Sequence, residues 1–221
     1  MPRIARGETA GGIYHIINRG NMRMQVFDDG DDYEYFLALV KQGFKREKIE
    51  LHAYCLMPNH FHLLVVPKYE KSLSRAMQWI MTSHVRHYHK KNKTSGHVWQ
   101  GRYKSFIVQQ ESYYHTVIRY IEANALRAGL VKEAQEWMYG SLAERLYQVR
   151  AMLDEPYVEL DRSWKDEVNT AMRKSELRKI RNSVNRQAPL GLEAWQIETA
   201  TRYGLLSTLN NRGRPRKSAD K

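Results

Sequence analysis

The sequence predicts an α+β fold in which a split βαβ unit forms an antiparallel sheet with its helices on one side, followed by a mostly helical and basic C-terminal extension. Apolar segments with strand and helix periodicity follow in the order strand, helix, strand, strand, helix, strand, helix. The middle two strands are separated only by a short turn with Pro and Asn, which indicates a hairpin. Beyond about residue 150 the chain becomes charged and weakly periodic. We therefore expect a first domain at residues 1–150 and a helical extension with a flexible tail at 151–221.

The first half of this unit is marked by clear start and stop signals. Residues 13–18 are rich in β-branched and aromatic side chains and follow two glycines, which predicts a strand. Residues 31–46 have apolar side chains at helical spacing, with acidic residues at the start and basic residues at the end. The hairpin strands are expected at residues 49–56 and 60–66, and Pro67 ends the second of them.

The second half continues the same order and gives a ferredoxin-like arrangement. A helix is expected at residues 73–90 and a bent strand at 98–108, in which Gly101 indicates a kink or a close backbone approach. The next helix spans 112–128, because Ser112 suits an N-cap and Gly129 a C-terminal stop. Further helices are expected at 137–149, 168–184 and 192–203.

Composition narrows the class of protein. Of the 221 residues, 36 are Lys or Arg and 24 are Asp or Glu, which gives a net charge of +12. Such a surplus favours a polyanion partner, although a merely basic protein is the alternative. Cys55 is the one cysteine, which excludes an internal disulfide and a cysteine zinc cluster. With no secretory signal or membrane-spanning apolar run, we expect a cytoplasmic, nucleoid-associated protein.

Two histidines on one predicted strand are the first candidate site residues. Successive side chains of a strand point to opposite faces, so His60 and His62 share one face and Phe61 points away. Two neighbouring imidazoles can hold one metal ion. Taken alone, the pair also fits two ordinary strand residues.

The helix at 112–128 offers the groups that a metal-dependent reaction would need. Tyr120 and Asn124 are four residues apart and therefore share one face of a helix. The phenol is a candidate nucleophile, and the carboxamide oxygen is a candidate third metal ligand. The alternatives are a half-buried aromatic ring and a polar residue without a role. We expect His115, on another face, to be structural, and the histidines at 84, 87 and 89 to meet phosphate or solvent.

Three segments together carry a resemblance to a known family. Residues 57–62 (Met-Pro-Asn-His-Phe-His) and 120–131 (beginning Tyr-Ile-Glu-Ala-Asn) resemble the paired motifs of single-tyrosine HUH transposases, most of all the REP-associated tyrosine transposases. Residues 98–103 resemble the Trp-Gln segment between those motifs. The resemblance covers roughly residues 10–150. The family often has Pro after the Asn, where this chain has Ala125, and we expect this difference only to relax a helix kink.

The resemblance implies a DNA strand transferase. Tyr120 would attack a scissile phosphate and form a 5′-phosphotyrosine, while His60, His62 and Asn124 would hold Mg²⁺ or Mn²⁺. The implied substrate is a short DNA hairpin with a flanking single strand, bound by a monomer or a homodimer. Two other classes remain open: a non-catalytic DNA-binding protein on the same fold, and a phosphodiesterase that uses water. A different tyrosine, Tyr113 or Tyr114, is the alternative nucleophile.

Cations and aromatic rings gather in the second helix, the loop after it and the bent strand. Such a mixture resembles a groove for single-stranded or hairpin DNA, and a solvated charged face over core aromatics is the alternative. The tail residues Arg212 and Arg214, in an Arg-Gly-Arg-Pro sequence, resemble an AT-hook or a merely solubilising tail. The other candidate DNA contacts are Arg75, Arg86, Lys90, Lys91, Lys93, Trp99, Gln100, Arg102, Tyr103 and Lys104.

Overall fold

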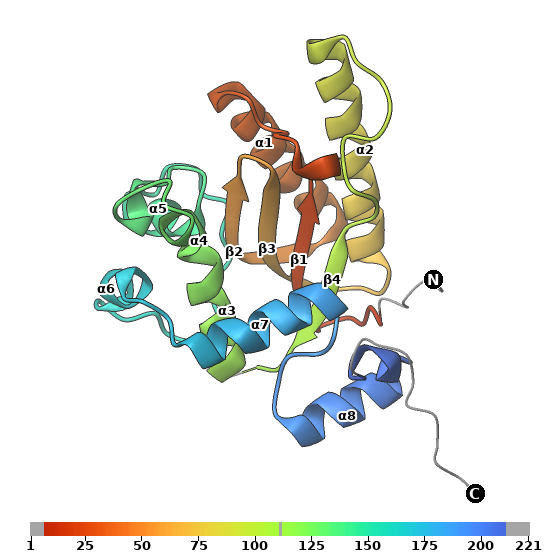
Figure 1. Ribbon diagram of the computed structural model, residues 1–221, viewed down its shortest axis with the longest axis vertical. Helices are drawn as coiled ribbons and strands as arrows, with labels where there is room; N and C mark the ends of the chain where they lie inside the picture. The colour runs from red at the N-terminus through yellow and green to blue at the C-terminus, as the bar shows by residue number, and fades with distance from the viewer. Residues whose placement is uncertain (1–6, 111, 211–221) are drawn as a thin grey trace, which may run out of the picture.

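Four antiparallel strands form the centre of the protein in a computed structural model that describes residues 7–110 and 112–210 (Figure 1). Their order across the sheet is β2-β3-β1-β4, so the first strand lies between the third and the fourth. This is the order that a split βαβ unit produces, and the predicted fold class is confirmed. The strands are β1 (Ile13–Arg19), β2 (Ile49–Met57), β3 (His60–Pro67) and β4 (Lys104–Val108).

The two helices inside this unit, α1 (Gly30–Glu47) and α2 (Ser72–Asn92), pack on one face of the sheet. Asp29 accepts a hydrogen bond from the backbone N–H of Asp32 and so caps the start of α1. Glu8 caps the start of α2, although it lies far from that helix in the sequence. Its carboxylate accepts hydrogen bonds from the backbone N–H groups of Leu73 and Ser74. The core between these helices and the sheet is rich in aromatic rings, among them Phe36 and Phe61.

The opposite face is covered by the chain that follows β4. Helix α3 (Ser112–Glu122) lies against β2 and β3, and the short helix α4 (Asn124–Arg127) continues from it. Buried side chains of the extension, such as Trp164 and Ile180, belong to the same core as those of α3. The remaining helices are α5 (Ser141–Tyr147), α6 (Trp164–Asn169), α7 (Lys174–Arg186) and α8 (Glu193–Arg202), with 3₁₀ turns at Asn21–Arg23, Ala134–Glu136 and Leu206–Thr208.

Later segments of the chain also pair with the two outer strands of the sheet. At β4, the Leu190 N–H donates to the Ile107 carbonyl at 2.9 Å, and the Gln109 N–H donates to the Leu190 carbonyl at 2.8 Å. At β2, the Leu56 N–H donates to the Tyr139 carbonyl at 2.9 Å. The Asp154 N–H likewise donates to the Leu51 carbonyl at 2.9 Å. Some of the backbone groups that would otherwise face solvent at the two edges of the sheet are therefore hydrogen-bonded within the protein.

Four predicted elements differ from the structure, and the simplest case is the helix predicted at 137–149, which spans only Ser141–Tyr147. The bent strand is shorter than predicted, because Gly101 has a φ of 137° and regular pairing begins only at Lys104. The helix predicted at 112–128 is interrupted at Ala123, whose ψ is 4°, so the interruption is present without the family's proline. The helix predicted at 168–184 is two helices, separated where Thr170 is extended with a ψ of 140°. Within the described ranges, no helix is long and apolar enough to cross a membrane.

Candidate active site

Strand β3 brings the two predicted histidines together on the face that α3 covers. The rings of His60 and His62 are 5.1 Å apart between centroids, at an interplanar angle of 78°. Phe61 points to the other face and packs on Phe36, as the alternation of a strand requires. His62 is buried, with 2% of its surface exposed, whereas His60 is half-buried.

Asn59 fixes which nitrogen of His60 is free. The Nδ2 group of Asn59 donates to the Arg23 carbonyl at 3.1 Å, so its Oδ1 atom is the one that faces His60. That oxygen lies 2.6 Å from Nδ1 of His60 and can only accept, so Nδ1 carries the hydrogen. In the neutral ring, Nε2 is then left with a lone pair for a metal ion.

His15 contacts His62 from the neighbouring strand and was not identified from the sequence. Its Nε2 atom lies 2.8 Å from Nδ1 of His62, and both rings are buried. The tautomers of the two rings decide which nitrogen donates; when Nδ1 of His62 donates, its Nε2 atom keeps the lone pair that a metal ion needs. Only the register of β1 on β3, which pairs His15 with Leu64 and Ile17 with His62, brings His15 to this place.

The interruption between α3 and α4 lies next to Tyr120 and Asn124. The Tyr120 ring lies 5.8 Å from His62 and 6.1 Å from His15, between ring centroids. Arg127 holds this turn, because its guanidinium donates two hydrogen bonds of 3.1 Å to the Tyr120 carbonyl and lies over the Tyr120 ring, with Cζ 4.2 Å from the centroid. It also donates to Oδ1 of Asn124. Nδ2 of Asn124 is buried without a hydrogen-bond partner among the described residues.

All four predicted catalytic and metal-binding residues line one cavity of about 370 Å³. Helix α7, from the extension whose role the sequence left open, forms part of its wall through Arg181, Val184 and Asn185. With Arg19 from β1 and Arg127 from α4, Arg181 makes three guanidinium groups around the cavity. Such a concentration of positive charge suits a phosphate group.

Burial keeps the two histidines of the cavity, and His15 behind them, neutral at physiological pH. It lowers the pKa of His60 to about 4 and that of His15 to about 3. Burial also lowers the pKa of His62 well below its usual value, and the neighbouring His15 and His60 add to the effect. A neutral imidazole is the form that binds a metal ion.

The protein donors at this cavity leave positions open for other ligands. Among the described residues, no group of three or more His, Cys, Asp or Glu side chains could hold a metal ion. An ion bound by His60 and His62 would therefore need the Asn124 oxygen and oxygens of water or phosphate. Open positions of this kind are typical of catalytic rather than structural metal sites.

The predicted DNA contacts fall into three groups. Gln100, Arg102 and Lys104 are exposed and line a hollow of about 320 Å³ that shares Arg19 and Ile17 with the cavity of Tyr120. Arg86, Lys90 and Lys93 are exposed on α2 and at its C-terminal end. Arg75 and Lys91 are also exposed, but their charges are engaged: Arg75 pairs with Glu47, and Lys91 with both Asp29 and Asp32, each at 2.7 Å.

Two aromatic contacts and one histidine were wrongly placed. Trp99 and Tyr103 are each only 5% exposed, so neither ring is free to stack on a base, because the segment before β4 folds inward. His84 does not face phosphate or solvent: it is 2% exposed and packs among Phe27, Phe36 and Trp99. Arg212 and Arg214 lie outside the described residues.

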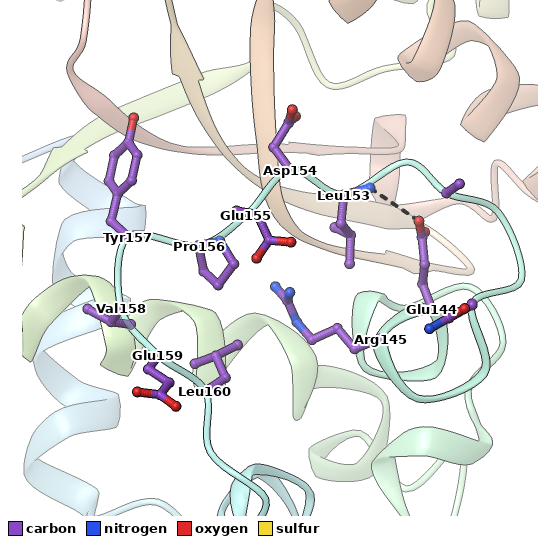
Figure 2. A pocket seen from close by; sticks show the side chains of 12 residues that line it. Glu144, Arg145, Leu153, Asp154, Glu155, Pro156, Tyr157, Val158, Glu159 and Leu160 are labelled. Atoms are coloured by element: carbon purple, nitrogen blue, oxygen red, sulfur yellow. Dashed lines mark hydrogen bonds between the residues drawn. The ribbon is translucent and has the colours of Figure 1, made fainter.

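A second hollow, shown in Figure 2, lies away from these residues. It has a volume of about 780 Å³ and is formed by Glu144, Arg145 and the chain at 148–160. The Glu144 carboxylate there accepts a hydrogen bond from the Leu153 N–H at 3.2 Å and so holds the loop to α5. None of the sequence-predicted site residues lines it.

Known proteins resemble this chain in sequence and in fold. A Haemophilus influenzae protein designated as a REP-associated tyrosine transposase is 24% identical over 154 residues, which span 64% of this chain and 85% of that protein. A solved structure of a REP-associated tyrosine transposase bound to a REP hairpin shows the same fold, with a TM-score of 0.53 and 16% identity, over 79% of this chain and 98% of that one. A family model described as transposase IS200 like matches residues 9–124, which include both histidines, Tyr120 and Asn124. Since this match covers more than half of the 221 residues, the protein belongs to the IS200-like transposase family.

Proposed function

We propose that the protein cleaves and rejoins DNA at a hairpin with a flanking single strand, using Tyr120 as the nucleophile and a divalent metal ion. One observation carries this proposal: Tyr120 lies in a cavity ringed by arginines, beside two histidines whose Nδ1 atoms are already occupied. The Mg²⁺ or Mn²⁺ ion would be held by His60, His62 and Asn124. When bound, it would polarise the scissile phosphate and draw charge from its oxygens.

The resemblance to the family implies the following reaction, for which the cavity supplies a tyrosine nucleophile. The Tyr120 oxygen attacks the phosphorus and loses its proton, while the bond from phosphorus to the 3′ oxygen breaks and that oxygen takes up a proton. The products are a 5′-phosphotyrosine and a free 3′-hydroxyl. Because the phosphodiester energy is kept in the covalent link, a 3′-hydroxyl can attack in reverse and rejoin strands without ATP.

The arginines of this chain would bind and orient the phosphate. Arg19, Arg127 and Arg181 come from three separate elements, and all three line this cavity. Arg127 also holds the Tyr120 carbonyl and the Asn124 oxygen, so it would position the nucleophile and a metal ligand together. Guanidinium groups in such places stabilise the charge that gathers on phosphate oxygens during transfer.

The flanking DNA would run over the exposed cations beside the cavity. We propose Arg86, Lys90, Lys93, Gln100, Arg102 and Lys104 as contacts, since the structure leaves them exposed. The related protein whose structure is known was solved with a REP hairpin, which supports DNA of this kind as the partner. Arg212 and Arg214 remain candidates for an additional contact, and a monomer or a homodimer is compatible with this surface.

A denaturing gel with an end-labelled hairpin substrate and Mg²⁺ or Mn²⁺ tests the proposal. The wild-type protein should form a covalent adduct, and Tyr120→Phe should form none while its DNA affinity stays within about twofold. Tyr113→Phe is the matched control, because Tyr113 is a half-buried tyrosine of the same helix that does not line the cavity. Tyr114 is a poor alternative, since its hydroxyl is buried against Nδ1 of His52 at 2.6 Å.

The three classes of function give different results on that gel. A nick without an adduct indicates a phosphodiesterase that uses water. Binding without cleavage indicates a DNA-binding protein without catalysis. An adduct that persists in Tyr120→Phe would show that another tyrosine is the nucleophile.

A further inference from the structure

A buried carboxylate that the proposed reaction does not use lies next to the candidate nucleophile in the sequence. Glu122 is the last residue of α3, two residues after Tyr120 and two before Asn124. Its side chain is completely buried, and it does not line the cavity of Tyr120. Successive residues of a helix are rotated by about 100°, so Glu122 and Tyr120 point to nearly opposite sides. The carboxylate therefore lies on the side of α3 that faces away from the cavity.

Three side chains from later parts of the chain donate hydrogen bonds to this carboxylate. Oγ of Ser141 and Nε of Arg145, both from α5, donate to Oε1 at 2.7 and 2.8 Å. Nε1 of Trp164, from α6, donates to Oε2 at 2.7 Å. Both oxygens are thus hydrogen-bonded, and Arg145 supplies the opposite charge. The set holds the carboxylate firmly, because the loss of any donor would leave a buried charge incompletely compensated.

A carboxylate is an unfavourable group at the end of a helix. The carbonyl groups of the last turn carry partial negative charge, which repels the charge of Glu122. The three donors offset this repulsion, and they also fix the direction in which the end of α3 points. An apolar side chain would fill the same space without fixing that direction. The cluster therefore has the properties of a device that sets position.

The same cluster connects the turn after α3 to the strands of the sheet. The guanidinium of Arg145 also donates to the His52 carbonyl on β2. β2 in turn pairs with β3, the strand that carries the two candidate metal-binding histidines. Two hydrogen bonds therefore lead from Glu122 to the hairpin of those histidines. Arg127 holds the same turn from the cavity side.

Helix α6 is held to α3 at a second point, one helical turn earlier. The guanidinium of Arg119 donates to the carbonyl of Glu167 at 2.8 Å and to that of Thr170 at 2.9 Å. α6 lies beside α3 between these bonds and the bond from Trp164 (Figure 1). Two attachments of this kind favour movement of the two helices as one unit.

We propose that Glu122 is a positioning residue, through which α6 of the C-terminal extension holds Tyr120 in line with the phosphate. The inference rests on the proposed function and adds to it a role for the extension in the chemical step. A displacement of a reacting group by about 1 Å can slow a reaction by about 100-fold. The bonds to Glu122 therefore act on the rate of cleavage and not on the affinity for DNA.

Trp164→Phe tests this role, because it removes the indole N–H and keeps an aromatic ring in the core. Formation of the covalent adduct in a single turnover should slow by about tenfold, while the Kd for the DNA hairpin stays within about twofold. Glu122→Gln should slow it by about 100-fold, because the charge is lost and an amide NH₂ group faces another donor. All rates are compared well below the unfolding temperatures of the variants.

A fluorine label at the nucleophile gives a second readout that does not depend on activity. 3-Fluorotyrosine incorporated at position 120 should give one ¹⁹F resonance in the otherwise unchanged protein. Trp164→Phe should shift or broaden this resonance, because the end of α3 is no longer fixed. A loss of global stability alone would not move the resonance of the folded molecules.

Trp137→Phe is the matched control. Trp137 is half-buried, and its Nε1 atom donates to the Leu56 carbonyl at 2.8 Å, so the same change removes an equivalent hydrogen bond that does not reach Glu122. This variant should keep the wild-type rate and resonance. Wild-type behaviour of Trp164→Phe in both readouts, or an equal change in the two variants, would overturn the inference and leave the proposed function intact. If the wild type forms no adduct, the proposed function fails, and a resonance that moves in Trp164→Phe alone would still support the positioning of Tyr120.

Discussion

The two faces of the sheet each hold a cluster of buried histidine and aromatic rings, and the two clusters differ in organisation. On the α2 side, His84 lies among Phe27, Phe36 and Trp99, and its Nδ1 atom is buried without a hydrogen-bond partner among the described residues. On the α3 side, the Nδ1 atoms of His60 and His62 are both hydrogen-bonded, beside a cavity with three arginines.

The burial of a histidine alone therefore does not distinguish a residue of a functional site from a residue of the hydrophobic core. It lowers the pKa of His84 to about 4, the same value that it gives His60. What differs is the arrangement around the rings: one set is oriented by neighbouring polar groups toward a cavity, and the other fills space. Three of the four predictions below test that distinction and the last compares two surface cations of α2; they run from the largest expected effect to the smallest.

His62→Ala should slow DNA cleavage strongly, whereas His84→Phe should leave it unchanged. Loss of a metal ligand removes several kcal/mol of charge stabilisation, so we expect adduct formation to slow by roughly 1,000-fold in His62→Ala. His84→Phe should cleave at the wild-type rate, because it replaces one buried ring by another. Single-turnover rates on the hairpin substrate measure both, and a comparable loss in the two variants would contradict the distinction.

His84→Phe should also change how stability depends on pH. The folded-state pKa of His84 is about 4, whereas an unfolded histidine has a pKa near its usual value of about 6.5. Between these values the unfolded state binds the additional proton, so stability falls as the pH is lowered through this window. At a pH below both pKa values, His84 therefore lowers the free energy of unfolding by on the order of 3 kcal/mol.

Urea unfolding from pH 8 to pH 4.5 measures this effect. Over that range the free energy of unfolding should fall less in the variant than in the wild type. The slopes of the two plots against pH should differ by up to the equivalent of one bound proton. Measurements at pH 8, above the unfolded-state pKa, provide the internal reference. An identical slope in both proteins would show that His84 does not contribute.

His15→Phe should weaken metal binding without removing a ligand. The variant keeps a buried ring but loses the contact of 2.8 Å that occupies Nδ1 of His62. Loss of such a contact typically costs 10- to 100-fold in metal affinity, which Mn²⁺ titration by calorimetry measures directly. His15→Gln, which keeps a polar group, should recover part of the affinity; equal affinities in all three proteins would argue against a positioning role.

The smallest effect concerns the surface cations of α2. Lys93→Ala should lower the salt dependence of DNA affinity by about one unit in the logarithmic slope, as expected for one lost phosphate contact. Lys91→Ala should leave the slope nearly unchanged, since Lys91 is already paired with Asp29 and Asp32. Binding titrations at several salt concentrations compare the two, and equal slopes would contradict the assignment.

Local periodicity was sufficient to predict the first three strands, the helices α1 and α2, and the shared face of His60 and His62. It could not predict His15, because the contact with His62 depends on strand register across 47 residues. Nor could it show that Lys91 is neutralised by carboxylates 59 and 62 positions away. Trp99 and Tyr103 were misplaced for a similar reason: an aromatic ring beside basic residues fits a core and a DNA surface equally well.

The pairing of later segments with both outer strands has a consequence for self-association. Exposed backbone groups on an edge strand are a template onto which a strand of another molecule can add, in ordered dimers or in aggregates. Here the residues around Leu190 cover part of β4, while Tyr139 and Asp154 cover parts of β2. The chain that follows β4 therefore leaves less of both edges open to strand exchange between copies of this protein, and a shortened chain that ends before Leu190 would lack the bonds that cover the edge of β4.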